Sequence, residues 1–338
     1  MKRGAILLLA VLALALFPTL GSTQGIATAG FSGIPWFNGL SSFGGIFGGP
    51  FSATCGQELF PKGITEFYVG YMDHRNGTTI DFSRSVPLGP FNGYQIRHQY
   101  PIRGVWLGLS ETINLSERIG LFGSGWVLLP SNQTDLETYN EMAAARNWNT
   151  RNSWWYIDGL ATFSPGAGFS FLAGVRYDKY TTEFRDPFAA FNVNSLPSDT
   201  ADVITHNVIP LVGAQAGYDC PQSRLLFRVV GFPTLLGSVK YRQNFAGTGA
   251  IEASGNYKKG YFLELFSQYV RKFGPGEVGI FARWSGTHGE VDLDVDSVDI
   301  AAPTTNGTFD LSLERYAWTV GGSVSLRFDL PFVNTPFM

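Results

Sequence analysis

Histidine is the side chain whose ordinary pKa lies nearest neutral pH, so the four histidines are the first candidates for acid–base chemistry. They are His74, His98, His206 and His288. None has a second histidine, a cysteine or a carboxylate at the spacing of a metal site. The best pairs are Asp73 with His74 and His288 with Glu290. Adjacent strand residues point to opposite faces, which separates the first pair. We therefore predict no catalytic residues, no metal and no cofactor.

Charged and amide side chains within alternating segments form the second set of candidates. They fall on the polar faces of predicted strands: Glu66, Asp158, Arg176, Asp178, Gln215, Arg228, Glu264, Gln268, Arg283, Arg315 and Arg327. In a closed barrel of about ten strands these faces point into a bore little wider than the one that eight strands fill with side chains. Because an unpaired buried charge costs several kcal/mol, we expect a lumen filled by salt bridges. The alternative is a polar track that selects a small solute.

About ten strand candidates carry these residues, and each has about the length that a tilted strand needs to cross a bilayer. They span 64–73, 102–114, 118–129, 152–164, 168–182, 206–219, 223–240, 257–272, 276–293 and 310–328. Connections after the even-numbered candidates are tight and rich in turn residues, whereas those after the odd-numbered ones are long and polar. The pattern predicts an all-β transmembrane antiparallel barrel of about ten strands, or twelve, with both termini in the periplasm.

The first residues predict export. Lys2 and Arg3 precede an apolar run from Ala5 to Phe17 and then small residues, as in a secretory signal peptide. We expect a signal peptide over 1–24, a Gly- and Phe-rich periplasmic leader over 25–62, the barrel over 63–330 and a tail over 331–338. After residue 20 no apolar run approaches the roughly 20 residues of a membrane-spanning helix. A net charge of −3 without a cluster of lysine and arginine excludes a nucleic-acid partner.

Aromatic residues fall near the ends of the predicted strands. Drawn alternately up and down, the strands bring five tryptophans near the external ends: Trp106, Trp126, Trp155, Trp284 and Trp318. Phenylalanine and tyrosine gather near the other ends. The sequence therefore predicts two aromatic girdles at the membrane interfaces.

The last predicted strand alternates strictly between apolar and polar residues. Its residues Thr319, Gly321, Val324, Leu326 and Phe328 have the polar-x-Gly-x-x-apolar-x-apolar-x-aromatic spacing of a closing strand. In this spacing the chain resembles the bacterial outer-membrane β-barrel proteins, although it continues past Phe328. The resemblance implies a Gram-negative outer-membrane location, insertion by the barrel assembly machinery through this signal, and contacts with outer-membrane lipid and lipopolysaccharide.

The sequence defines the function of the protein less closely than it defines the fold. We expect a non-enzymatic barrel, either a narrow porin-like channel or a structural or surface-interaction protein. The strand count and loop layout, but no motif, are similar to those of the omptin family of outer-membrane proteases, whose site at the external rim uses paired Asp and an Asp-His couple. A hydrolase at the rim, of omptin or lipid-hydrolase type, is therefore the alternative.

Two cysteines remain in this exported chain. Cys55 precedes the first predicted strand and Cys220 lies in the tight turn after the sixth. Both would lie on the periplasmic side, where the oxidising compartment favours a bond. We predict a Cys55–Cys220 disulfide that ties the leader to the barrel.

Overall fold

A computed structural model describes residues 63–84, 95–139, 144–166, 168–191, 196–245, 249–274, 276–300 and 308–328. The predicted signal peptide, leader and tail, and Cys55 with them, lie outside these residues. The regular elements are the strands β1 (Gly63–Arg84), β2 (Ile96–Asn114), β3 (Ile119–Tyr139), β4 (Ala144–Gly166), β5 (Phe169–Phe191), β6 (Thr200–Asp219), β7 (Ser223–Phe232), β8 (Leu236–Phe245), β9 (Gly249–Phe273), β10 (Gly276–Ile300) and β11 (Thr308–Phe328). In this part of the chain no helix has the length and apolarity to span a membrane.

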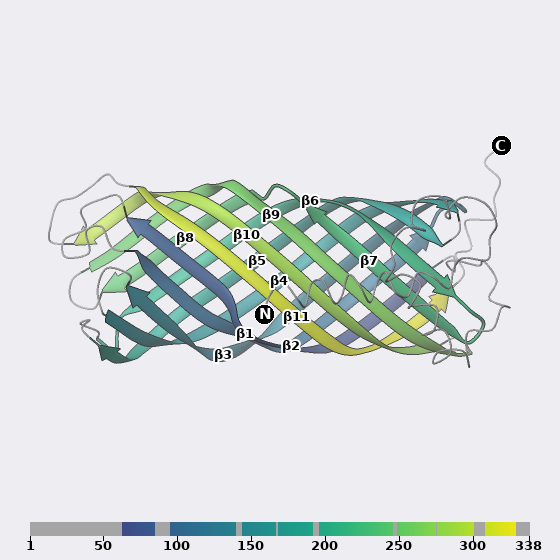
Figure 1. Cartoon of the computed structure of the whole chain (residues 1–338), viewed down its shortest axis with the longest axis horizontal. Coiled ribbons are helices and arrows are strands. Elements are labelled where there is room, and N and C mark those ends of the chain that lie inside the picture. Colours follow the sequence, from purple (N-terminus) through teal and green to yellow (C-terminus); the bar gives the residue numbers. More distant parts are fainter. Residues whose placement is uncertain are drawn as a thin grey trace, which may run out of the picture. The chain divides into compact units, whose positions relative to one another are not determined.

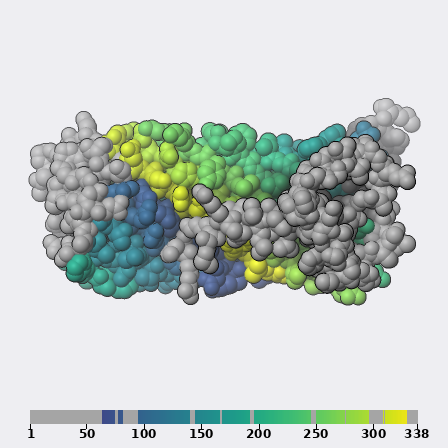
Figure 2. Space-filling model, in the orientation of Figure 1, coloured from purple at the N-terminus to yellow at the C-terminus, as the bar shows by residue number. Residues whose placement is uncertain are grey.

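The strands form a closed antiparallel ring, and they run obliquely around it (Figure 1). β11 pairs with β1 from Gly63 opposite Phe328 onward, which joins the two ends of the sheet. Figure 2 shows these first and last strands side by side on the barrel wall. β7 and β8 occupy one place in the ring, because both pair with β6 and β9. The break between them contains Pro233, which has no N–H for a ladder bond.

The eleven described strands therefore make a ring of ten, and the predicted all-β antiparallel barrel is confirmed. Short connections lie at one end, here called the turn end. Leu115 N donates to Ile119 O at 2.9 Å in one of them, and Cys220 N donates to Ser223 O at 2.8 Å in another. Gly274, with φ of 62°, has the left-handed conformation that the β9–β10 turn requires. The opposite end of the barrel is called the far end.

Near the turn end the barrel is apolar outside and polar inside. On β10 the outward residues Val278 and Ile280 are 55% and 67% exposed, while the inward Glu277 is 1% exposed. On β11 the outward Val324 is half exposed and the inward Ser325 is fully buried. This is the arrangement of a barrel whose outer wall faces lipid. The outward apolar residues of this region are called the apolar band.

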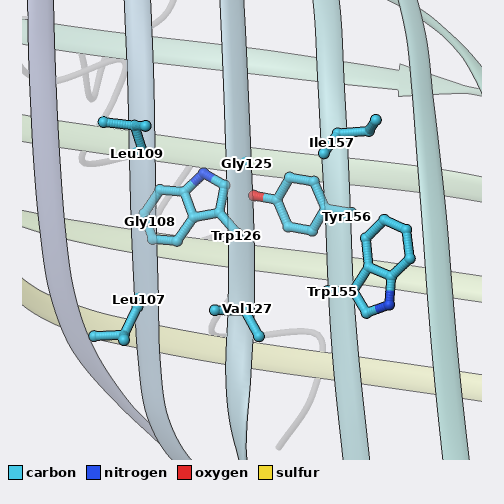
Figure 3. Close-up of a pocket in the computed structure, with 9 residues that line it drawn as sticks. All are labelled: Leu107, Gly108, Leu109, Gly125, Trp126, Val127, Trp155, Tyr156 and Ile157. Atoms are coloured by element: carbon cyan, nitrogen blue, oxygen red, sulfur yellow. The ribbon is translucent and has the colours of Figure 1, made fainter.

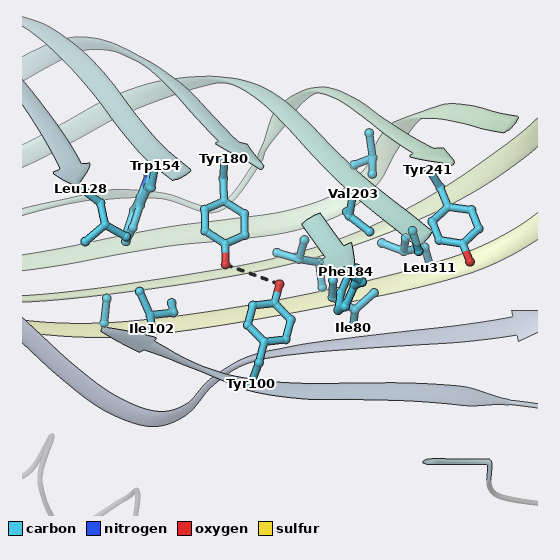
Figure 4. Packing of buried hydrophobic residues seen from close by; sticks show 14 of the residues in the cluster. Ile80, Tyr100, Ile102, Leu128, Trp154, Tyr180, Phe184, Val203, Tyr241 and Leu311 are labelled. Carbon is cyan, nitrogen blue, oxygen red and sulfur yellow. Dashed lines mark hydrogen bonds between the residues drawn. The ribbon is translucent and has the colours of Figure 1, made fainter. Parts of the chain in front are cut away.

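Toward the far end the same strands reverse this pattern. On β10 the outward positions beyond the band carry Glu290 and Asp292, whereas the inward Val291 and Leu293 are buried. The inward apolar residues of several strands form one core, in which Ile80, Val203 and Leu311 lie close together (Figure 4). Beyond the band the barrel thus resembles a soluble protein, with its apolar side chains within. This part is called the upper barrel.

The upper barrel explains why the strands are longer than predicted. Apart from β7 and β8, they span from 19 residues in β2 to 25 in β9 and β10, about twice what a bilayer crossing needs. Irregular pairing occurs in three adjacent strands, beside Met72 in β1, between Gln99 and Trp106 in β2–β3, and beside Leu128 in β3. Such bulges shift the phase of a strand and increase its twist.

The predicted external girdle is wrong for two of its five tryptophans. Trp106 and Trp126 point into the lumen, with exposures of 0% and 4%. There they lie against each other, with ring centroids 6.2 Å apart. Gly108 allows this packing, because a Cβ atom at that position would lie 2.5 Å from the Trp126 ring. On the outer wall Trp284 packs against Trp318.

Candidate functional site in the barrel lumen

Ionised side chains cross the lumen at three heights, here called the lower, middle and upper rungs. The lower rung lies nearest the turn end and contains Glu66, Asp219, Glu277, Arg224, Lys272 and Arg327. Arg224 on β7 bonds Glu66 on β1 and also Glu277 on β10, at 3.1 Å to the latter. Arg327 on β11 bonds Glu277 and, at 3.2 Å, Asp219 on β6. The carboxylates of this rung are each shared between cations or polar groups.

The middle rung is built around Glu264 of β9, which is 1% exposed. Its Oε2 accepts hydrogen bonds from Arg176 Nη1 at 2.8 Å and from Arg283 Nη2 at 2.7 Å. Arg176 also holds Asp158 through two donors, at 2.6 and 2.8 Å. Arg228 of β7 is the fifth charged residue at this height, and the charge of Glu264 interacts with it.

The upper rung joins Asp178 of β5 to Arg315 of β11 at 3.2 Å. Asp178 also accepts a hydrogen bond from Asn207 at 2.8 Å and one from the indole of Trp154. Above it, Tyr180 lies beside Tyr100 across the lumen, and the hydroxyl groups are 3.4 Å apart (Figure 4). The guanidinium of Arg315 lies 4.2 Å from the Trp154 ring, so aromatic faces contribute to its burial.

Most ion pairs within the rungs join strands that are not neighbours in the ring. Arg224–Glu66 joins β7 to β1, Arg176–Glu264 joins β5 to β9, and Arg315–Asp178 joins β11 to β5. A direct contact between such strands spans the bore. Side chains therefore meet across the lumen at three separate heights within the described residues.

Of the eleven side chains that alternation assigned to the lumen, nine are buried. The other two, Asp158 and Arg327, bond to buried partners. Nine of the eleven join hydrogen bonds of the rungs, whereas Arg228 and Gln215 do not. Sequence reasoning missed Arg224, Asp219, Lys272 and Glu277. Arg224 shares its strand face with Arg228, and Glu277 shares one with Arg283, so counting in twos from the assigned residues would have found both.

The residues of the proposed assembly signal lie where β11 closes the ring. Thr319 is buried inside, Val324 and Leu326 face outward, and Phe328 pairs with Gly63. Gly321 is required by close packing, because a Cβ atom there would lie 2.2 Å from the carbonyl oxygen of Val69. Their role in assembly remains a prediction. So does the disulfide, since Cys220 is buried in the β6–β7 turn but Cys55 lies outside the described residues.

A buried carboxylate–histidine pair lies in the upper barrel. His98 Nδ1 is 2.6 Å from Asp135 Oδ2, and His98 Nε2 is 3.8 Å from Glu137 Oε2. Arg146 Nε donates to Glu137 at 3.0 Å. Burial lowers the pKa of His98, but the charge and hydrogen bond of Asp135 and the charge of Glu137 outweigh burial and raise the pKa above its usual value. The imidazolium is therefore held between two carboxylates.

The sequence did not reveal this pair because it depends on the register of β2 and β3, which places His98 opposite Glu137. The other histidines lie elsewhere. His288 is 3.7 Å from both Glu290 and Glu314, and His206 is 2.8 Å from the hydroxyl of Tyr177. In the described part of the chain no three histidine, cysteine or carboxylate residues are placed to hold a metal ion.

Comparison with known structures agrees with this geometry. The outer membrane protease OmpT from Escherichia coli superposes with a TM-score of 0.62 over 82% of this chain and 99% of its own, at 13% identity. The chain has the fold of the outer-membrane β-barrels. The match to the outer membrane protein OprG from Pseudomonas aeruginosa, at 9% identity, covers 81% of this chain and 100% of OprG, with a TM-score of only 0.35. No protein-family model and no curated protein sequence matches the chain.

The likeness to OmpT shows the fold of this outer-membrane β-barrel and carries no residue roles. The predicted outer-membrane location agrees with it. A shallow hollow on the outer wall is apolar: it lies at Gly125, which has no side chain, between Leu107, Val127 and Ile157 (Figure 3). Because it lies in the apolar band it faces lipid, so the candidate site for polar chemistry is the lumen.

Proposed function

We propose that this chain is a non-enzymatic outer-membrane barrel with a closed lumen, whose upper barrel is a surface for contacts outside the membrane. The observation that carries the proposal is the set of ion pairs that cross the bore. Arg176 and Arg283 hold the same oxygen of Glu264 from β5 and β10, and other pairs cross the lumen above and below them. A solute would have to separate all three rungs to pass.

Separation of these rungs is costly. Each freed ion would remain in a narrow bore without its partner, and removal of one member of a buried pair costs about 3–5 kcal/mol. The apolar core of the upper barrel adds a second barrier, because Val203, Leu293 and Leu311 fill the bore beyond the rungs. A closed barrel therefore accounts for both the polar and the apolar contents of the lumen.

The hydrolase alternative has less support from the geometry. A general base must direct an unprotonated nitrogen toward the proton that it removes. Both ring nitrogens of His98 face carboxylates, and the residue is 3% exposed. His98 is thus arranged as a buried cation that ties β2 to β3 rather than as a base.

Anionic lipid is the partner that the outer wall supports. Just beyond the apolar residues Ile157 and Val175, the outward face carries Trp155, Tyr177 and Lys179, with the Trp155 and Tyr177 rings 5.4 Å apart. Aromatic and basic side chains at this level suit the headgroup region of a membrane. Lipopolysaccharide vesicles should stabilise the wild type more than a Lys179→Gln variant, and equal stabilisation would contradict this contact.

Conductance in planar lipid bilayers tests the closed lumen. We expect no discrete steps from the wild type. Replacing one ion pair in each rung by alanine, Glu66 with Arg224, Glu264 with Arg283 and Asp178 with Arg315, together with Leu311→Ala in the apolar core, keeps the charge balance. This variant opens space at every barrier and should produce steps. The matched control replaces Glu252 and Arg242, an exposed pair 3.1 Å apart on the outside of β9 and β8, and should produce none.

Two results would contradict the proposal. Discrete steps from the wild type would establish an open channel. Turnover of peptide or lipid substrates that is lost on His98→Ala, in a variant that still folds and inserts, would establish the rim hydrolase instead.

A further inference from the structure

The three rungs differ in charge balance. The lower rung has three carboxylates and three cations, namely Glu66, Asp219, Glu277, Arg224, Lys272 and Arg327. The upper rung has one of each, Asp178 and Arg315. The middle rung has two carboxylates against three arginines, namely Asp158, Glu264, Arg176, Arg228 and Arg283. Its formal charge is therefore +1, whereas each of the other two rungs balances.

Arg228 carries this excess charge. Its side chain is 7% exposed, and within the described residues it makes no hydrogen bond and no ion pair. The guanidinium lies between two aromatic faces, 4.2 Å from the Phe122 ring and 4.9 Å from the Phe266 ring. Glu264 is near enough to sense its charge, but that carboxylate already accepts hydrogen bonds from Arg176 and Arg283. Ring faces offset only part of the cost of burying a cation.

A second polar side chain beside Arg228 also has no hydrogen-bond partner among the described residues. Gln215 of β6 pairs with Arg228 of β7 in register, and both point into the lumen. The Gln215 amide is 8% exposed and makes no hydrogen bond to any described residue. Buried amide groups ordinarily find a partner. Guanidinium and amide N–H donors thus lie next to each other, and neither side chain donates a hydrogen bond to a described residue.

We propose that Arg228 and Gln215 bind a small monovalent anion, such as chloride, in the lumen beside the middle rung. A single negative charge would bring that rung to zero, whereas a divalent anion would leave it at −1. The neighbouring Phe122 and Phe266 rings, together with the buried Leu226 two residues before Arg228, favour a weakly hydrated halide over a strongly hydrated ion. The protein supplies the hydrogen-bond donors, and the anion from solution supplies the negative charge that balances the middle rung.

Bromide tests the site directly, because its anomalous scattering locates it in a crystal. Crystals of the full chain grown in sodium bromide should show an anomalous peak within hydrogen-bonding distance of the Arg228 guanidinium. Arg228→Gln should lose this peak, whereas Arg271→Gln, at an exposed arginine of β9, should keep it. Peaks at exposed arginines with none at Arg228 would mean an adventitious ion only and would overturn the proposal.

A solution measurement provides the second test. At constant ionic strength, replacing gluconate by bromide should raise the urea midpoint of the wild type, because a ligand that binds only the folded state stabilises it. The shift should vanish in Arg228→Gln. If that variant does not fold, Gln215→Leu keeps the cation and should show a smaller shift. Equal shifts in all variants, or none in the wild type, would show that the ring faces alone hold Arg228.

Discussion

Replacement of Glu264 by glutamine tests the ionic framework of the lumen at its centre. The substitution keeps the size of the side chain but removes the charge that Arg176 and Arg283 share, at 2.8 and 2.7 Å. The middle rung would change from +1 to +2 with no new space for water. Loss of one partner from a buried pair costs about 3–5 kcal/mol, and glutamine retains an acceptor oxygen, so we expect about 3 kcal/mol. That value corresponds to a roughly 100-fold smaller ratio of folded to unfolded protein.

The matched control is Glu252→Gln, which makes the same chemical change on the same strand. Glu252 pairs with Arg242 at 3.1 Å, but both side chains are about half exposed. Exposed pairs contribute about 0–1 kcal/mol, so this variant should unfold almost as the wild type does. The contrast between the two variants isolates burial, because residue type and strand are shared.

The assay is reversible urea unfolding in phospholipid vesicles, followed by tryptophan fluorescence and by the gel mobility of unboiled samples. Both probes should give the same midpoint for a two-state transition. Adding Arg283→Gln to Glu264→Gln returns the middle rung to +1 and should recover part of the loss. Equal stability of Glu264→Gln and Glu252→Gln would refute the reasoning, since the crossing pairs would then contribute no more than surface pairs.

Three further outcomes are expected. Ile280→Lys should cost about 2–4 kcal/mol of folding free energy in vesicles, whereas His288→Lys, on the same face of β10 beyond the apolar band, should cost little; equal costs would contradict the assigned band. Because the pKa of His98 is raised in the folded state, its stabilisation is fully present below its ordinary pKa of about 6.5 and is lost as pH rises through the folded value. The difference in unfolding free energy between wild type and His98→Gln should thus be larger at pH 5 than at pH 9, and a difference independent of pH would rule this out. Mass spectrometry of non-reduced peptides should find Cys55 linked to Cys220, and two free thiols would end that prediction.

The sequence predicted the ring of ten because the apolar band imposes the same period on every strand. The strict alternation from Arg315 to Phe328 matches the observed inward and outward faces of β11. Strand length was harder to predict, since β1 from Thr78 to Asp81 keeps the alternation but reverses which face is apolar: Ile80 is buried inside, and Asp81 lies on the outer face. A prediction based on outward apolar residues ends a strand where its surroundings change from lipid to water. It therefore ended the first strand at residue 73, whereas β1 continues to Arg84.

The sequence predicted which side chains face the lumen but not which of them form ion pairs with each other. Alternation within one strand places Arg176 and Glu264 inside, yet their contact depends on the relative height of β5 and β9, which no local pattern records. Trp106 illustrates a different error. Its position along the strand agreed with a girdle. However, Trp106 is four residues from Ser110 and therefore lies on the same polar face, which points into the lumen.

The reversal of polarity along each strand also fixes how deep the protein sits. On β10 the outward residues change from Ile280 to Glu290 within one continuous strand, and the lipid-facing part falls within the roughly 9–11 residues of a tilted crossing. A shift toward either side would bring carboxylates into hydrocarbon or expose Ile280 to water. The barrel is therefore matched to one bilayer thickness. In a thicker bilayer it must thin the surrounding lipid, because a closed ring tied across its bore cannot lengthen its apolar surface.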